Sequence, residues 1–195
     1  NDSPRPIRNG ARVRIYQGTS ETTARLTIGA AASIAPGAGA PLAAVEPGQK
    51  AFARVRLESP VVLTRGDRFV MRSYSPLATI GGGTVLDPEP RRAPVRSARG
   101  AGRFAELARE GAAGDAGAVA AMIEESGVRG LILEELTSRA GLTHDEVQAV
   151  ATALGDAVVR LGARLVSAGI ARRLEARVLE TLAAHHTSTP MSEGL

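Results

Sequence analysis

The chain has 195 residues, 44% hydrophobic and 3% aromatic, and its 24 Lys and Arg against 20 Asp and Glu leave a net charge of +4. It has no cysteine and few aromatics, which excludes disulfides, thiolate metal ligands and cysteine nucleophiles and argues against a platform for stacking single-stranded bases. No apolar run reaches the roughly 20 residues that cross a bilayer, so we expect a cytoplasmic protein with no membrane partner.

The first part of the chain alternates apolar and polar residues in short segments separated by turn residues. Six segments carry this strand pattern: residues 12–16, 22–28, 51–57, 61–63, 68–72 and 81–87. Their spacing is typical of a small barrel or sandwich. We therefore expect a six-stranded antiparallel β-barrel over residues 1–88.

Three consecutive glycines, Gly81, Gly82 and Gly83, open the last predicted strand. Glycine weakens a strand interior through backbone entropy and lack of packing, so a triplet predicts a bulge or a close approach by another part of the backbone. The triplet leads into a strand, so it lacks the helix N-terminus with which glycine-rich loops bind phosphate. The sequence Arg65-Gly66-Asp67, between two predicted strands, reads as a turn.

The pattern changes beyond the predicted barrel. Residues 89–101 are rich in proline and arginine and predict a linker. Farther on, Thr143 and Glu146 form a capping box for a helix that reaches about Leu154. Residues 158–167 resemble a short hairpin through a glycine.

Residues 103–111, 115–126 and 131–142 carry apolar positions at helical spacing. The resulting order helix, helix, turn, helix, hairpin is that of a winged helix, which we expect over residues 102–175. A long amphipathic helix follows, and residues 176–195 are expected to begin a second, truncated winged helix. The predicted fold class is thus multi-domain, with a β-barrel first and a winged-helix domain after it.

The two halves of the chain differ in charge. Residues 1–100 hold 15 Lys and Arg and 7 Asp and Glu, whereas residues 101–195 hold 9 and 13. A basic first half suits a surface that meets phosphates. An arginine-biased composition is the alternative explanation, since Lys50 is the one lysine among the 24 basic residues.

No catalytic set is recognisable. A P-loop needs Gly-Lys followed by Ser or Thr, but Lys50 is followed by Ala51. His185 and His186 are adjacent on a helix, with no carboxylate at metalloenzyme spacing, and read as a pair at a helix end. We expect no metal site, no cofactor and no enzymatic activity in these residues.

Four segments together resemble a known family. They are GTSETTARL (18–26), VEPGQKAFARVRLESPVV (45–62), GDRFVMRSYSP (66–76) and TIGGGTVLDP (79–88). In order and spacing they are similar to the third, elongation factor Tu-like barrel domain of the selenocysteine-specific translation elongation factor, and the later half resembles that family's first C-terminal winged helix. The chain would then be an interior fragment of a longer GTPase, whose GTP and Mg²⁺ bind elsewhere.

The resemblance implies a set of tRNA contacts. The turn of Arg72, Ser73, Tyr74 and Ser75 matches the family's tRNA-facing turn, and Arg25 matches a basic residue on a neighbouring strand. We add Lys50 as a further candidate. The implied partners are selenocysteinyl-tRNA, the ribosome and, through winged helices outside this chain, the selenocysteine-insertion hairpin of the mRNA.

Where the family commonly has a histidine before Gly-Thr, this chain has Ile15-Tyr16-Gln17, so the resemblance gives no strand histidine a role here. The predicted recognition helix carries Asp145 and Glu146 and no Lys or Arg. Because an anionic first turn repels phosphates, we expect this winged helix to act as a spacer.

Three other readings remain. The chain could be the C-terminal part of another translational GTPase, which the winged-helix half disfavours because elongation factor Tu ends after its third domain. It could be a winged-helix DNA-binding regulator, which should carry basic residues on the recognition helix. An independent enzyme on the barrel would need a catalytic set that the sequence does not offer.

Overall fold

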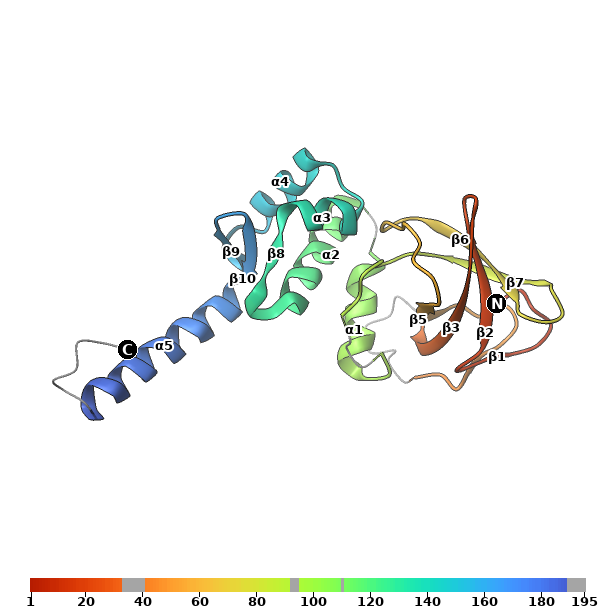
Figure 1. Cartoon of the computed structure of the whole chain (residues 1–195), viewed down its shortest axis with the longest axis horizontal. Helices are drawn as coiled ribbons and strands as arrows, with labels where there is room; N and C mark the ends of the chain where they lie inside the picture. Colours follow the sequence, from red (N-terminus) through yellow and green to blue (C-terminus); the bar gives the residue numbers. More distant parts are fainter. Residues whose placement is uncertain (33–40, 92–94, 110, 189–195) are drawn as a thin grey trace.

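A computed structural model of the chain describes residues 1–32, 41–91, 95–109 and 111–188. Figure 1 shows a curved sheet at the end that holds the N-terminus, a group of helices beside it, and one long helix that projects away from both. We call residues 1–91 the sheet domain and residues 95–167 the helical domain. A β domain followed by helices, as expected from the sequence, is therefore confirmed.

The described residues of the sheet domain form two antiparallel sheets. The strands are β1 (Ile7–Arg8), β2 (Arg12–Gln17), β3 (Ser20–Ala31), β4 (Ala44–Val45), β5 (Ala51–Leu57), β6 (Arg68–Ser73) and β7 (Thr79–Thr84). A five-stranded sheet has the order β5-β3-β2-β6-β7, and β1 pairs with β4 in a two-stranded ribbon. The alternation read from the sequence thus places four of the five main strands at their observed positions.

The expected six-stranded barrel differs from what the described residues form. The predicted strand at 61–63 is not paired and lies in a loop that follows Pro60. No described strand joins β7 to β5. Instead the Asp2 N–H donates to the Ile80 carbonyl of β7 at 2.9 Å, and the Asn1 ammonium donates to the Gln49 carbonyl near β5 at 2.8 Å.

The core of the sheet domain follows from strand alternation. Val13 and Ile15 of β2 are buried. Arg12 and Arg14 alternate with them along the strand and therefore lie on the outward face. The buried cluster consists of Ile7, Val13, Ile15, Ala24 and Leu26, with Val55, Leu57, Phe69, Met71 and Ile80 packed against it. Each large aliphatic side chain that is fully buried contributes about 1.5–3 kcal/mol to stability.

The glycine triplet makes room for Phe69. A Cβ on Gly82 would lie 2.6 Å from the Phe69 carbonyl oxygen, and one on Gly83 would lie 2.8 Å from the edge of the Phe69 ring. Gly81 has a φ of +149° and lies where the register of β6 and β7 shifts between Met71 and Arg72. Both sequence expectations, a bulge and a close backbone approach, are confirmed.

The helical domain combines short helices with a small sheet. Its elements are α1 (Ala98–Leu107), α2 (Gly111–Ser126), the 3-10 helix η1 (Gly127–Arg129), β8 (Leu131–Ile132), α3 (Leu133–Ala140), α4 (His144–Ala153), the 3-10 helix η2 (Gly155–Ala157), β9 (Val158–Leu161) and β10 (Arg164–Ser167). The strands pair antiparallel in the order β8-β10-β9. The capping box at Thr143 is confirmed, since its hydroxyl accepts from the Glu146 N–H and the Glu146 carboxylate accepts from the Thr143 N–H.

Helices extend across two of the expected boundaries. The linker at 89–101 is shorter than predicted because α1 begins at Ala98, where the Ser97 hydroxyl accepts from the Gly100 N–H and caps the helix. At the other end α5 (Ala168–Ser188) runs without a break through the boundary that we placed between residues 175 and 176.

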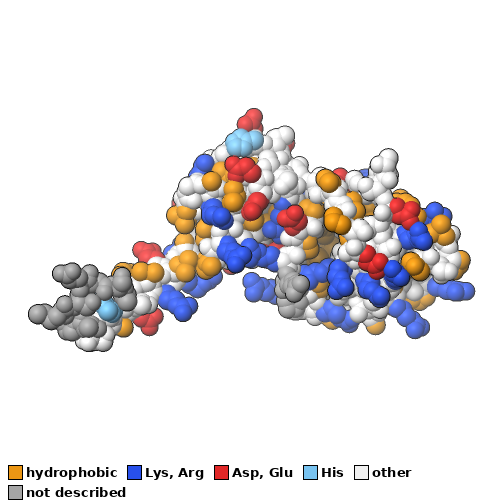
Figure 2. Space-filling model, in the orientation of Figure 1, with side chains coloured by type: hydrophobic (Ala, Val, Ile, Leu, Met, Phe, Trp, Pro, Cys, Tyr) orange, Lys and Arg blue, Asp and Glu red, His pale blue; other side chains and the backbone are white. Residues whose placement is uncertain are grey.

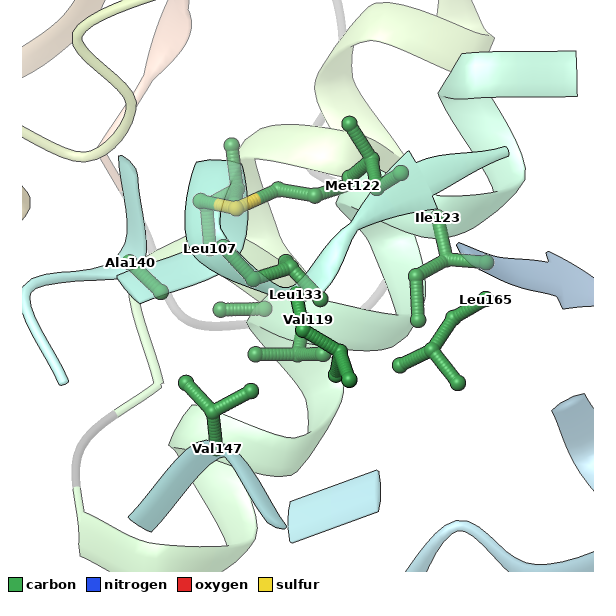
Figure 3. Packing of buried hydrophobic residues seen from close by; sticks show 11 residues of the cluster. Leu107, Val119, Met122, Ile123, Leu133, Ala140, Val147 and Leu165 are labelled. Carbon is green, nitrogen blue, oxygen red and sulfur yellow. The ribbon is translucent and has the colours of Figure 1, made fainter. Parts of the chain in front are cut away.

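Apolar side chains from every main helix of this domain meet in one core. Figure 3 shows Leu107, Met122, Leu133 and Leu165 pointing toward one another from α1, α2, α3 and β10. Leu86, from the segment after β7, packs against the same cluster. The sheet domain therefore contributes directly to the helical core.

The Arg65 turn provides a second contact between the domains. Arg65 donates to Asp115 at 2.5 Å and to the Arg109 carbonyl at 3.1 Å, and the Thr64 hydroxyl donates to the Ser138 carbonyl at 2.9 Å. A Cβ on Gly141 would lie 2.7 Å from the Arg65 carbonyl oxygen. The turn is thus seated between α2 and α3.

A buried network of four charged side chains completes the junction. Arg139 of α3 donates to both oxygens of Asp87, at 2.8 and 2.6 Å, and to Glu125 of α2 at 3.0 Å. Arg103 of α1 bonds to the same two carboxylates. The Asp87 and Arg139 side chains are 3% and 5% exposed, so each charge depends on its partners.

The pKa of Asp87 reflects this balance. Burial raises it, but the hydrogen bonds and charge of Arg139, together with the charge of Arg103, outweigh burial and hold the pKa below its ordinary value. A depressed native pKa contributes stability that is present above the unfolded value of about 3.9 and is lost as the pH falls through the native pKa.

Only the first turns of α5 are packed. Ala168 and Ile170 are buried, whereas Leu174, Val178 and Leu182 are exposed along one side of the projecting helix. Among the described residues, no helix is both long enough and apolar enough to cross a membrane.

Asp87→Asn should lower the free energy of unfolding by about 3 kcal/mol at neutral pH, because it leaves buried Arg139 with weaker compensation. Below about pH 4 the free energy of unfolding of the parent should fall toward that of the variant, because Asp87 becomes protonated. Urea denaturation at a series of pH values measures both effects.

The matched control is Glu106→Gln, which removes an exposed ion pair with Arg109 and should change stability by less than about 1 kcal/mol. Equal losses in the two variants would contradict the assignment of Asp87 to the junction.

Candidate nucleic-acid interface

The outward face of the five-stranded sheet brings arginines together. Directly opposite residues on paired strands share a face, so the register identifies neighbours. Three opposite pairs are arginine with arginine: Arg14 with Arg72, Arg12 with Arg25, and Arg25 with Arg56. We call these five residues the arginine strip. It crosses four neighbouring strands, β5, β3, β2 and β6.

This arrangement is unfavourable for the sheet alone. Like charges directly opposite each other destabilise an antiparallel pair. Of the five arginines in the strip, Arg12 and Arg14 make ion pairs, whereas Arg25, Arg56 and Arg72 make none with the described residues. The strip therefore has an excess of positive charge that an anionic ligand would neutralise.

Two carboxylates partly offset the strip. Arg12 donates through Nε and Nη2 to the two oxygens of Glu58, at 3.1 and 2.8 Å, and Arg14 donates to Glu21 at 2.5 Å. The hydrogen bond from Arg12 holds the pKa of Glu58 below its usual range, and that from Arg14 does the same for Glu21. Both carboxylates thus remain charged at neutral pH.

Two tyrosines lie against the guanidinium groups. The Tyr74 ring centre is 4.3 Å from the guanidinium carbon of Arg12 and 5.5 Å from that of Arg14, and the Tyr16 ring centre is 5.8 Å from that of Arg72. These are cation–π distances. The tyrosine rings therefore help to hold the guanidinium groups of Arg12, Arg14 and Arg72 in place.

Three of the candidate residues from the sequence fall within this surface. Arg72 and Arg25 belong to the strip, and Tyr74 contacts it. Arg72 is only partly exposed, and its Nε is a buried atom without a hydrogen-bond partner.

The other three candidates differ. Ser73 has a structural role, since its hydroxyl accepts from the Ala78 N–H at 3.1 Å and closes the turn. Ser75 is exposed at the tip of that turn. Lys50 precedes β5 at the end opposite Arg56, six residues and about 20 Å away along the strand. The structure does not bring Lys50 to the strip.

Sequence reasoning missed Arg12, Arg14, Tyr16 and Arg56 as site residues. The signal was present, because Arg12, Arg14 and Tyr16 alternate with buried Val13 and Ile15, which predicts that all three face outward. What the alternation does not give is the register that sets Arg14 against Arg72.

The helical domain is electrostatically different. Figure 2 shows Lys and Arg spread over the sheet domain, whereas Asp and Glu gather over the upper part of the helical domain. Asp145 and Glu146 lie in the first turn of α4. Among the described residues, no group of three or more His, Cys, Asp or Glu could hold a metal ion, and the rings of His185 and His186 lie 6.3 Å apart at the end of α5.

Comparison with known proteins finds a family that the sheet domain matches. Residues 1–92 match the family described as "Selenocysteine-specific elongation factor, beta-barrel domain". The sheet domain is therefore similar to that barrel domain. The match favours the selenocysteine-specific factor over the other translational GTPases and over a DNA-binding regulator.

The similarity extends into the helical domain. A selenocysteine-specific elongation factor from Desulfomicrobium baculatum is 28% identical over 198 aligned positions, which cover 99% of this chain and 29% of the relative. The crystal structure of the bacterial selenocysteine-specific elongation factor EF-Sec matches 94% of this chain with a TM-score of 0.60 and 18% identity, and this match supports the fold. The chain covers 26% of that solved chain, so it spans under a third of either relative.

Arg12→Ala should raise the pKa of Glu58 toward its ordinary value of about 4.3, because the carboxylate loses its hydrogen-bond donor. The pKa of Glu21 should stay depressed, since its main partner is Arg14. Carboxyl titration by NMR measures both residues in one sample, and a Glu58 pKa that does not move would disprove the pairing.

Proposed function

We propose that this chain is the tRNA-contacting and connecting part of a selenocysteine-specific translation elongation factor, which delivers selenocysteinyl-tRNA to the ribosome. The observation that carries the proposal is the arginine strip beside the turn at 72–75, on a domain similar to that family's barrel domain. Arg72, Arg25 and the turn would contact the tRNA, and Lys50 would contribute at the margin.

The chemistry of the strip suits a sugar–phosphate backbone. Guanidinium groups bind phosphates through paired N–H donors. Tyr16 and Tyr74 lie against arginines of the strip, so part of each ring is used to hold the guanidinium groups. Folded RNA is recognised largely through its shape and its phosphate and 2′-hydroxyl groups, which an outward sheet of arginines can contact.

We further propose that the helical domain is a winged helix. The order α2, β8, α3, α4, β9, β10 supports this, with β9 and β10 as the wing. Because α4 starts with two carboxylates and presents no Lys or Arg, this unit would connect rather than read nucleic acid.

The long helix α5 would open a second winged helix, covering residues 176–195 in part. Its exposed side of Leu174, Val178 and Leu182 is the surface that such a unit would cover. Further winged helices of the intact factor would read the selenocysteine-insertion hairpin of the mRNA. GTP and Mg²⁺ would bind to a GTPase domain of the intact protein, because these residues carry no P-loop.

Arg72→Ala should weaken tRNA binding by about threefold to tenfold, because it removes one charge-assisted contact to phosphate. The slope of log affinity against log salt should fall by about one, the value for one lost phosphate contact. Fluorescence anisotropy at several salt concentrations measures both quantities.

The matched control is Arg68→Ala, at the other end of the same strand and opposite Thr84. It should leave affinity and slope near those of the parent. Identical effects from the two arginines would indicate general electrostatic attraction and would remove Arg72 from a defined site.

A further inference from the structure

Glu58 occupies the part of Arg12 that a phosphate would use. The two nitrogens Nε and Nη2 form the fork with which arginine binds carboxylate or phosphate in a bidentate manner. Both already donate to Glu58, at 3.1 and 2.8 Å. A phosphate can gain this fork only if the carboxylate leaves it.

The same competition holds at Arg14. Its Nη1 donates to Glu21 at 2.5 Å. Glu21 lies near the start of β3, and Glu58 directly follows β5, so the carboxylates approach the strip from two sides. Both acids are more than a third exposed, so their side chains can swing into solvent without disturbing the core.

The remaining arginines of the strip are in a different state. Arg25, Arg56 and Arg72 have no ion pair within the described residues. The strip thus combines three arginines that make no ion pair with two whose donors are already used. Folding does not require the arginine strip, because arginines directly opposite each other on paired strands destabilise the sheet.

We propose that Glu21 and Glu58 are internal competitors for the RNA backbone, which hold Arg14 and Arg12 in the free protein and are displaced when phosphates bind. The inference rests on the proposed RNA-binding function and specifies how that site is restrained. Its consequence is selectivity for a chain of closely spaced phosphates over single anions.

The selectivity follows from the number of contacts. A single phosphate ion that binds Arg12 forms one ion pair but must break the Arg12–Glu58 ion pair, which has similar geometry. A polynucleotide first engages the open arginines, which raises the effective concentration of its next phosphates beside the occupied ones. Displacement of the carboxylates then becomes favourable.

Binding of a labelled RNA hairpin stem to the 195-residue chain tests the proposal. Glu58→Gln and Glu21→Gln should each tighten binding by about threefold to tenfold and steepen the salt dependence by about one phosphate contact. Glu46→Gln removes one carboxylate from the same domain, near the β4 loop, and should have a smaller effect. Melting temperatures of all variants verify that the fold is kept.

A double-mutant cycle separates competition from a general loss of negative charge. If Glu58 acts by occupying Arg12, Glu58→Gln should give no gain in the Arg12→Ala background beyond that of Glu46→Gln. A full gain in that background would overturn the proposal. So would weaker binding by Glu58→Gln, because it would show that the carboxylate positions Arg12 for RNA.

Failure of the proposed function is distinguishable. If the parent chain and Glu46→Gln do not bind the hairpin but Glu21→Gln/Glu58→Gln does, and this binding is lost in the Arg12→Ala background, the restraint is supported. If neither binds, RNA contact by this surface and its restraint are both wrong. If the parent binds and the substitutions change nothing relative to Glu46→Gln, RNA contact stands and the restraint is wrong.

Discussion

The Asp87 carboxylate is the constraint on which the arrangement of the two domains depends. It follows the last strand of the sheet domain and receives hydrogen bonds from Arg139 of α3 and Arg103 of α1, while Glu125 of α2 shares both arginines. Four separate segments therefore meet at one buried cluster of charges. Such a cluster is stable only when every member is present, because a lone buried charge is costly.

The chain uses arginine in two opposite ways. At the junction, Arg103 and Arg139 are buried and matched by two acids. On the outward sheet face, the five arginines of the strip have two acids between them, and three pairs of arginines lie directly opposite each other. The first arrangement supports the fold, and the second is unfavourable without a partner. This contrast is the physical reason to regard the sheet face, and not the junction, as the candidate binding surface.

Local pattern was sufficient for much of this structure. Alternation located β2, β3, β5 and β6, the glycine triplet marked the close approach of Phe69, and Thr143 with Glu146 marked the start of α4. These features depend on residues close in sequence. The resemblance then directed attention to Arg72 and Arg25.

Features that depend on distant pairing were not predictable in the same way. The roles of Arg65 and Asp87 require knowledge of which helices lie beside the sheet domain. Likewise, Glu58 is 46 positions from Arg12, and nothing in either local segment indicates that they meet. The hydrogen bonds of Asn1 and Asp2 to the two edges of the described sheet also join residues far apart in sequence, and no local pattern indicated them.

The projecting helix α5 has a mechanical consequence. Its 21 residues extend for about 31 Å at 1.5 Å per residue, and its buried residues, Ala168 and Ile170, lie at the root. A tilt of about 10° at that root would move the far tip by roughly 5 Å, the rise of one helical turn. A small change in side-chain packing under the first turn of α5 would therefore displace its C-terminal end by as much as the rise of a whole helical turn.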